Sequence, residues 1–226
     1  MGLKERIAEV DKRVEEACRK AGRSTNDIHI IAVTKYVSVE ATAEVVKHGI
    51  REIGENRLQD AAPKREAIGD EASWHFIGHL QTNKVKDVIG KFEYIHSLDR
   101  PSLAAEIDKK AAALGIEAKC FIQVNVSGEE SKYGLAPESL FSFAESLKSY
   151  GNIRVVGLMT MAPLEAEPEA TRPVFRGLRE LRDELNSRSI LPYEVSHLSM
   201  GMSNDFEVAI EEGATWIRLG TVLVGK

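Results

Sequence analysis

One lysine of the chain ends a run of apolar residues, which is an unusual place for a charged side chain. Lys35 closes the segment HIIAVTK (29–35), in which residues 30–33 are all apolar. Desolvation in such a place favours the neutral amine, which can form a Schiff base with a carbonyl compound. Alternatively, the stem of the lysine lies along apolar surface while its ammonium group reaches water. The position of Lys35 by itself leaves both interpretations open.

Two loops near the end of the chain contain residues suited to binding a phosphate group. The segment SMGMSND (199–205) stands before a helix that we expect to begin near Ser203, and the segment GT (220–221) follows a short apolar run. In (β/α)8 barrels, the loops after the last two strands often bind phosphate through backbone N–H groups at a helix start. A simple helix cap is the alternative interpretation of either loop alone.

Arg218 precedes the second of these loops by two residues, so on a strand it shares a face with Gly220. The alternative to a ligand contact is a salt bridge with a buried carboxylate. A lysine, a phosphate-binding loop and an arginine at one barrel mouth are together what pyridoxal phosphate (PLP) requires. The lysine takes the aldehyde, the loop takes the phosphate, and the arginine meets the pyridine nitrogen.

Histidines of the chain do not form a recognisable metal-binding motif. His75, His79, His96 and His197 stand near the ends of apolar runs, without HExxH or a comparable spacing. We expect these histidines to form structural hydrogen bonds, and we predict no metal site because no ligand set can be assembled from them.

The elements that would position these residues alternate between strands and helices. The first strand candidate, 29–35, is an almost uninterrupted β-branched run typical of a strand covered on both faces. The other strand candidates occupy the segments 50–56, 74–80, 94–98, 119–126, 155–160, 193–200 and 216–220. Helical patterns occupy the segments 39–49, 57–68, 81–90, 101–114, 137–148, 170–187 and 203–212. This alternation predicts an α/β fold with a parallel sheet, and eight units favour one (β/α)8 TIM barrel domain over residues 1–226. The pattern is also compatible with a doubly wound open sheet.

An additional helix and the composition complete the prediction. Leu3, Ile7 and Val10 begin an apolar stripe on an otherwise charged N-terminal helix, which lacks the apolar core of a signal peptide. No segment is apolar enough to span a bilayer, so we expect a cytoplasmic protein without a membrane partner. The net charge of -5 argues against binding nucleic acid. Cys18 and Cys120 are predicted to be buried free thiols.

Motifs over nearly the whole chain resemble those of the pyridoxal phosphate homeostasis protein family. The resemblance is carried by AVTKYVS (32–38), GENRLQD (54–60), WHFIGHLQTNK (74–84), HSLDR (96–100), IQVNVSGEESKYG (122–134), GLMTM (157–161), HLSMGMSND (197–205) and IRLGT (217–221). It implies a fold-type III barrel like the N-terminal domain of bacterial alanine racemase, with PLP on a lysine. The chain departs from the family at Tyr36, Val37 and Ser38, where many relatives have Thr-Lys-Pro, and at the C-terminal VLVGK, where Phe-Gly is common.

The resemblance assigns cofactor-binding roles and no catalytic residue. The assigned residues are Lys35 for the Schiff base, Asn56 for the pocket wall, Arg218 for the pyridine nitrogen, and Ser199, Met200, Gly220 and Thr221 for the phosphate.

The function implied by the resemblance is to hold PLP on Lys35 and to take part in vitamin B6, amino-acid and keto-acid homeostasis without robust catalysis. Arg218, as a permanent cation, disfavours protonation of the pyridine nitrogen, and we expect no second domain of the kind that contributes to the alanine racemase site. We expect a monomer whose partners are PLP and apo-enzymes that need it. The alternatives are an amino-acid racemase that uses Lys35 with Tyr36 or a histidine, and a Schiff-base aldolase acting on a phosphorylated carbonyl substrate.

Overall fold

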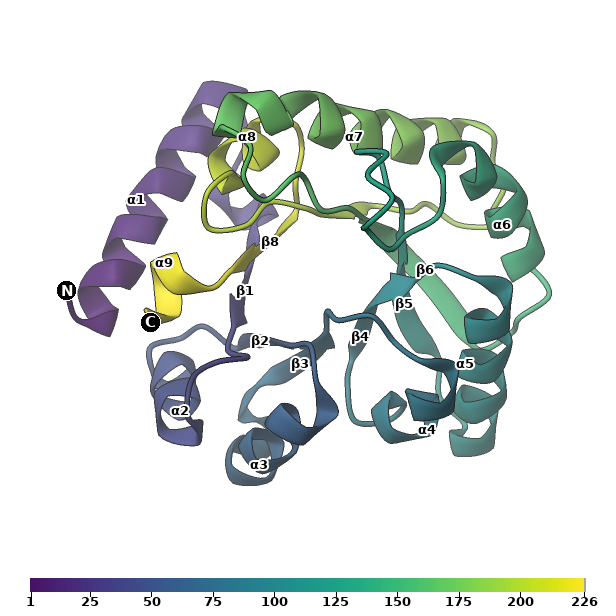
Figure 1. Ribbon diagram of the computed structural model, residues 1–226, viewed down its shortest axis with the longest axis horizontal. Helices are drawn as coiled ribbons and strands as arrows, with labels where there is room; N and C mark the ends of the chain where they lie inside the picture. Colours follow the sequence, from purple (N-terminus) through teal and green to yellow (C-terminus); the bar gives the residue numbers. More distant parts are fainter. Residues whose placement is uncertain (226) are drawn as a thin grey trace.

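Eight parallel strands form a closed barrel in the computed structural model, which describes residues 1–225 (Figure 1). The strands are β1 (His29–Val33), β2 (Glu52–Glu55), β3 (Ser73–Phe76), β4 (Tyr94–Leu98), β5 (Ala118–Gln123), β6 (Ile153–Met159), β7 (His197–Ser199) and β8 (Trp216–Leu219). Each strand pairs with the next one along the chain, and β8 pairs with β1 to close the barrel. Closure covers both faces of every strand, which is why the strands consist mainly of apolar residues.

Helices surround the barrel and cover its outer face (Figure 1). They are α1 (Leu3–Ala21), α2 (Val39–Lys47), α3 (Leu58–Ile68), α4 (Val85–Val88), α5 (Pro101–Leu114), α6 (Leu140–Leu147), α7 (Arg172–Ser187), α8 (Phe206–Glu211) and α9 (Thr221–Val224). Short 3₁₀ turns occupy Thr25–Asp27, Gly69–Glu71, Thr82–Lys84, Pro137–Ser139 and Pro168–Thr171. Over residues 1–225, no helix combines the length and the apolar character needed to cross a membrane.

The N-terminal helix α1 is additional to the strand–helix repeat and lies beside α8 and α9 (Figure 1). The guanidinium group of Arg6 donates hydrogen bonds to the carbonyl oxygens of Leu223 at 2.8 Å and Val224 at 3.1 Å. Just beyond the other end of α1, Arg23 donates to the carbonyl oxygen of Ile210 at 2.8 Å. These contacts satisfy carbonyl groups at helix ends, so this N-terminal region braces the helices that follow β7 and β8.

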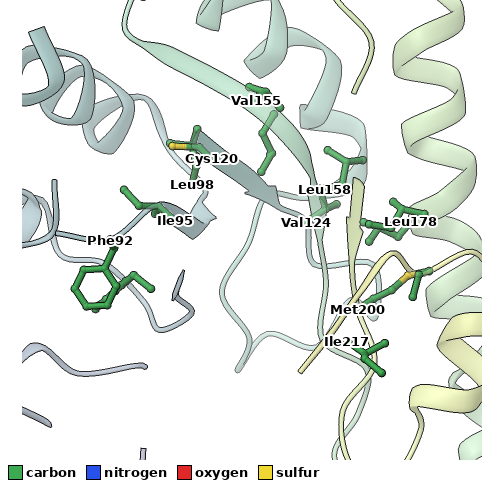
Figure 2. Packing of buried hydrophobic residues seen from close by; sticks show 14 of the residues in the cluster. Phe92, Ile95, Leu98, Cys120, Val124, Val155, Leu158, Leu178, Met200 and Ile217 are labelled. Atoms are coloured by element: carbon green, nitrogen blue, oxygen red, sulfur yellow. The ribbon is translucent and has the colours of Figure 1, made fainter. Parts of the chain in front are cut away.

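A layer of apolar side chains fills the space between the strands and the helices (Figure 2). Leu158 of β6, Ile217 of β8 and Leu178 of α7 belong to this layer and are fully buried. Burial of apolar area stabilises the fold by about 25 cal/mol per Å². The outward side chains of the strands are thereby fixed, which also fixes the direction of the inward side chains.

A second, smaller cluster fills the barrel interior. Ile31, Phe121, Met159 and Trp216 come from four strands and contact one another across the barrel. Because side chains alternate along a strand, the inward position after Trp216 on β8 is Arg218. The apolar cluster therefore forms a floor beneath the C-terminal ends of the strands, where (β/α)8 barrels place their functional residues.

The predicted barrel with an additional N-terminal helix is confirmed, and the open sheet is excluded because β8 pairs with β1. Several boundaries differ from the prediction. β1 ends two residues before Lys35, and the helix expected over 81–90 consists of a 3₁₀ turn and the four residues of α4. The sequence patterns overestimate the lengths of these elements, because the point at which the backbone leaves regular structure is not fixed by a local pattern. Cys18 and Cys120 are buried and unpaired, as predicted.

Candidate ligand-binding site

A cavity of about 790 Å³ lies at the C-terminal ends of the strands, and its volume is typical of small-molecule sites. The cavity brings together Lys35, Asn56, Arg218, Gly220 and Thr221, which are five of the seven residues assigned by resemblance. Apolar and aromatic side chains supply much of the remaining wall: Val33, Tyr36, Val37, Ile77, Tyr133, Met161, Leu164, Ala166, Met202 and Val224. Residues that are distant in the sequence thus meet at one barrel mouth.

Lys35 follows a backbone segment that is anchored by a buried ion pair. The ammonium group of Lys64, on α3, donates to the carbonyl oxygen of Thr34 at 2.6 Å and to Oε1 of Glu55 at 2.7 Å. The hydroxyl group of Thr34 donates to the same carboxylate oxygen at 2.5 Å. Lys64 and Glu55 are almost completely buried, whereas Lys35 is half-buried and lines the cavity. The anchor therefore fixes the peptide that carries the candidate nucleophile.

Asn56 places an unsatisfied acceptor in the cavity wall. Its Oδ1 atom is buried and has no hydrogen-bond partner within the described residues. A buried polar atom without a partner costs about 1–3 kcal/mol, so a donor on a bound molecule would relieve this cost. Gly78 packs directly against Asn56, since a Cβ atom on Gly78 would lie 2.5 Å from the Asn56 carbonyl oxygen. The absence of a side chain at Gly78 therefore allows Asn56 its place in the wall.

Arg218 lies at the base of the cavity and is only 4% exposed. Its guanidinium group donates to Oγ of Ser199 at 2.7 Å and to the carbonyl oxygen of Thr160 at 3.0 Å. Burial lowers the pKa of Arg218 to about 10, which still leaves the group cationic at neutral pH. Its polar partners among residues 1–225 are a hydroxyl and a carbonyl, so no carboxylate of the described residues forms the salt bridge considered from the sequence.

The loops after β7 and β8 meet on one side of the cavity. Ser203 and Asn204 line it from the first loop, and Gly220 and Thr221 line it from the second. The hydroxyl group of Ser203 accepts a hydrogen bond from the backbone N–H of Gly220 at 3.2 Å, which joins the loops. Hydroxyl groups and backbone N–H groups are suitable donors for a phosphate.

Ser199 and Met200 do not line the cavity, and the phosphate role that the resemblance assigns to them stays a prediction. The hydroxyl of Ser199 is fully buried between Arg218 and His96. Met200 points to the opposite side, into the apolar layer of Figure 2, and its N–H donates to the carbonyl oxygen of Trp216 at 3.1 Å. The structure therefore presents Ser203 and Asn204, four residues further along the same motif, to the cavity.

The histidines occupy different places from those suggested by the predicted strand ends. His75 and His96 point into the barrel and are fully buried, whereas His197 begins β7 at the opposite end from the cavity. Hydrogen bonds of His75 and His96 confirm their predicted structural role. No cluster of potential metal ligands is found among residues 1–225.

His79 and Tyr133 are cavity residues that the sequence did not reveal as a pair. Their rings stack with centroids 3.9 Å apart, and both line the cavity. Burial lowers the pKa of His79, so its imidazole is neutral at neutral pH. The sequence indicates His79 only as a polar residue near a strand end, and Tyr133 comes from a loop that carries no regular pattern.

Comparisons with known proteins agree with this architecture. The family model of the alanine racemase N-terminal domain matches residues 8–226. The pyridoxal phosphate homeostasis protein of Aquifex aeolicus (strain VF5) is 48% identical over 229 residues, covering 100% of this chain and 99% of that protein. The structure of PipY from Synechococcus elongatus PCC7942, with PLP bound, is 32% identical with a TM-score of 0.85, covering 99% of this chain and 100% of that one.

A more distant similarity shows the shared fold alone. An alanine racemase of Clostridium difficile 630 has a TM-score of 0.77 at 17% identity, covering 98% of this chain and 59% of that one. The fold and the site thus define a (β/α)8 barrel of the alanine racemase N-terminal domain class. Within this class, the chain belongs to the pyridoxal phosphate homeostasis protein family.

Proposed function

We propose that the protein binds PLP in the cavity at the barrel mouth and holds it through a Schiff base with Lys35. The observation that carries the proposal is the meeting of Lys35, the buried cation of Arg218 and the two joined loops around one cavity. The PLP-bound structure of PipY, which matches this chain over its whole length, supports the same cofactor.

The residues of the cavity fit PLP at each of its functional groups. Lys35 supplies the amine for the aldehyde, and Arg218 supplies a cation for the pyridine ring. Ser203 and Thr221 supply hydroxyl donors for the phosphate, and Thr221 adds a backbone N–H, while Gly220 lines the same wall and donates its own N–H to Ser203. The unpartnered Oδ1 of Asn56 offers an acceptor to a polar group of the ligand. When bound, PLP supplies an electrophilic aldehyde and an electron-withdrawing ring.

We further propose that the protein holds and delivers the cofactor within vitamin B6, amino-acid and keto-acid homeostasis, without robust turnover. The name shared by its curated relatives supports this role. The buried cation of Arg218 lines the cavity and would disfavour protonation of the pyridine nitrogen of bound PLP, so the ring would be a weaker electron sink. Exposed side chains of Tyr36, Tyr133 and Leu164 line the cavity, so its rim reaches solvent and suits exchange with apo-enzymes.

A racemase is the second candidate, and His79 is the observation that favours it. Its neutral imidazole lines the same cavity as Lys35, so the site contains a base besides the lysine. Exchange of amino-acid α-protons with solvent deuterium, followed by NMR, tests this alternative. Exchange at rates typical of enzymes, lost in His79→Phe, would replace the carrier role with catalysis.

The binding proposal is tested by titrating the cofactor-free protein with PLP and following the visible absorption of the bound form. We expect a saturable yellow complex for the unaltered protein and none for Lys35→Ala. Lys84→Ala removes an exposed lysine at the same end of the barrel and should bind like the unaltered protein. A colourless protein would contradict the proposal and return the Schiff-base aldolase to consideration. Transfer of PLP to an apo-enzyme, measured as restored activity of that enzyme, tests delivery.

A further inference from the structure

A continuous line of buried hydrogen bonds runs from Arg218 to the far end of the barrel. Arg218 donates to Oγ of Ser199 at 2.7 Å, and the same Oγ lies 2.9 Å from Nδ1 of His96. Nε2 of His96 lies 3.0 Å from Nδ1 of His75, whose Nε2 lies 2.7 Å from Oε2 of Glu52. Glu52 begins β2 and is partly exposed, so the line ends near solvent at the N-terminal face.

Arg218 and Glu52, at the two ends of this line of hydrogen bonds, determine the direction in which hydrogen is donated along it. A guanidinium group can only donate, so Ser199 accepts from Arg218 and passes its single hydroxyl hydrogen to Nδ1 of His96. His96 then carries its hydrogen on Nε2 and donates to His75, and His75 donates from Nε2 to the carboxylate of Glu52. In the opposite direction, the hydroxyl hydrogen of Ser199 would have no acceptor among the described contacts.

The surroundings keep both imidazoles neutral. Burial lowers the pKa of His75 and of His96, and the nearby cation of Arg218 lowers that of His96 further. The ring of His96 stacks on Phe121 with centroids 4.1 Å apart, and that of His75 stacks on Tyr94 at 4.7 Å. Each ring therefore has a fixed plane and one hydrogen to donate.

We propose that Ser199, His96, His75 and Glu52 form a positioning chain that holds the guanidinium group of Arg218 against the cofactor ring; this inference rests on the proposed function. A hydroxyl group rotates freely unless its hydrogen has an acceptor. His96 accepts that hydrogen and so leaves the lone pairs of Ser199 for Arg218. His75 and Glu52 in turn fix the tautomer of His96, as partners of a ring nitrogen do in other sites.

The positioning chain can be tested first in the protein without cofactor. Nitrogen-15 NMR of the histidine rings should show His75 and His96 neutral, with hydrogen on Nε2, between about pH 7 and 8, because both pKa values lie below 6.5. Hydrogen on Nδ1 of His96, or protonation of His96 within this range, would overturn the proposed direction. This measurement remains valid even if the protein does not bind PLP, so it separates failure of the chain from failure of the proposed function.

The effect on Arg218 is tested with variants that keep the shape of the barrel. His96→Phe retains a ring beside Phe121 but removes both nitrogens, whereas His96→Gln keeps one acceptor and one donor. We expect His96→Phe to release PLP about tenfold faster, which is the scale of one hydrogen bond to a charged group. The absorption spectrum of the bound PLP should shift as well. His96→Gln should restore release to within about twofold of the unaltered protein. His197→Phe is the matched control, because His197 is a half-buried ring outside the positioning chain. This variant should leave the rate of PLP release unchanged.

A double-mutant cycle distinguishes the positioning chain from independent packing effects of its residues. Ser199→Ala should accelerate release as much as His96→Phe does, because both interrupt the same connection to Arg218. The double variant should then release PLP no faster than either single variant. Multiplicative effects, about a hundredfold in the double variant, or no effect of His96→Phe on release and spectrum, would overturn the proposal.

Discussion

The ammonium group of Lys64 lies 2.6 Å from the carbonyl oxygen of Thr34, so a buried lysine of helix α3 anchors the peptide that leads into Lys35. The same ammonium group pairs with Glu55, which directly precedes Asn56 in the cavity wall. One buried cation thereby holds two segments of the site together. Its position links the stability of the barrel to the geometry around the candidate nucleophile.

Removal of this cation should destabilise the protein. Lys64→Met leaves the carboxylate of Glu55 buried without its partner, and breaking such a pair costs about 3–5 kcal/mol. Denaturant unfolding measures the loss, with Lys84→Met as the exposed control that should change the free energy of unfolding by less than about 0.5 kcal/mol. Equal stability of Lys64→Met and the unaltered protein would show that the pair does not anchor the fold.

The close approach of Gly78 to Asn56 should make this glycine essential for binding. The Cβ atom of Gly78→Ala would lie 2.5 Å from the carbonyl oxygen and 2.9 Å from Cα of Asn56, so the backbone of Asn56 must move. We expect a loss of about 1–3 kcal/mol in stability, together with weaker PLP binding. Gly151→Ala is the matched control, because a Cβ atom there has no neighbour within 4 Å. Similar binding by both variants would contradict the role of this contact.

The joined loops should recognise phosphate specifically. Ser203→Ala removes a hydroxyl that lines the cavity and joins the loops, so we expect affinity for PLP to fall about tenfold. Affinity for pyridoxal, which lacks the phosphate, should change little. Calorimetric titration with both ligands checks this difference, with Ser142→Ala on the exposed face of α6 as the control. A parallel loss for the two ligands would place the phosphate elsewhere.

The buried histidines should make the fold sensitive to mild acid. The pKa values of His75 and His96 lie below their ordinary value of 6.5, so the unfolded chain binds protons that the native barrel rejects. The contribution of these two histidines to the free energy of unfolding is therefore fully present above pH 6.5. It is lost as the pH drops below 6.5, by about 1.4 kcal/mol per pH unit for each histidine. Denaturant unfolding at several pH values measures the slope, which His96→Gln should reduce. A slope that is unchanged in this variant would exclude His96 as its source.

Much of the fold could be predicted from the sequence because it depends on local patterns. Runs such as 30–33 and 120–122 are apolar on both faces, which is typical of a covered parallel strand. Closure of the barrel was favoured by the number of units, but the pairing of β8 with β1 is a long-range contact that no local pattern determines.

The site was predictable only in part, because a shift of one residue along a strand reverses the direction of a side chain. Lys35 and Arg218 stood out as charges within apolar runs, and both line the cavity. Ser199 and Met200 shared a motif with Ser203, yet the end of β7 turns one inward beneath Arg218 and the other outward. The burial of Lys64 depends on tertiary packing of α3, which no local pattern of the sequence indicates.

The central claim is that Lys35 carries PLP, and reduction by borohydride tests it most directly. Borohydride converts a Schiff base into a stable amine, so the added mass can be located by digestion and mass spectrometry. The account predicts one modified peptide, with the adduct at Lys35, and no adduct in Lys35→Ala. An adduct distributed over surface lysines such as Lys84, or an unmodified Lys35 in a yellow protein, would contradict it.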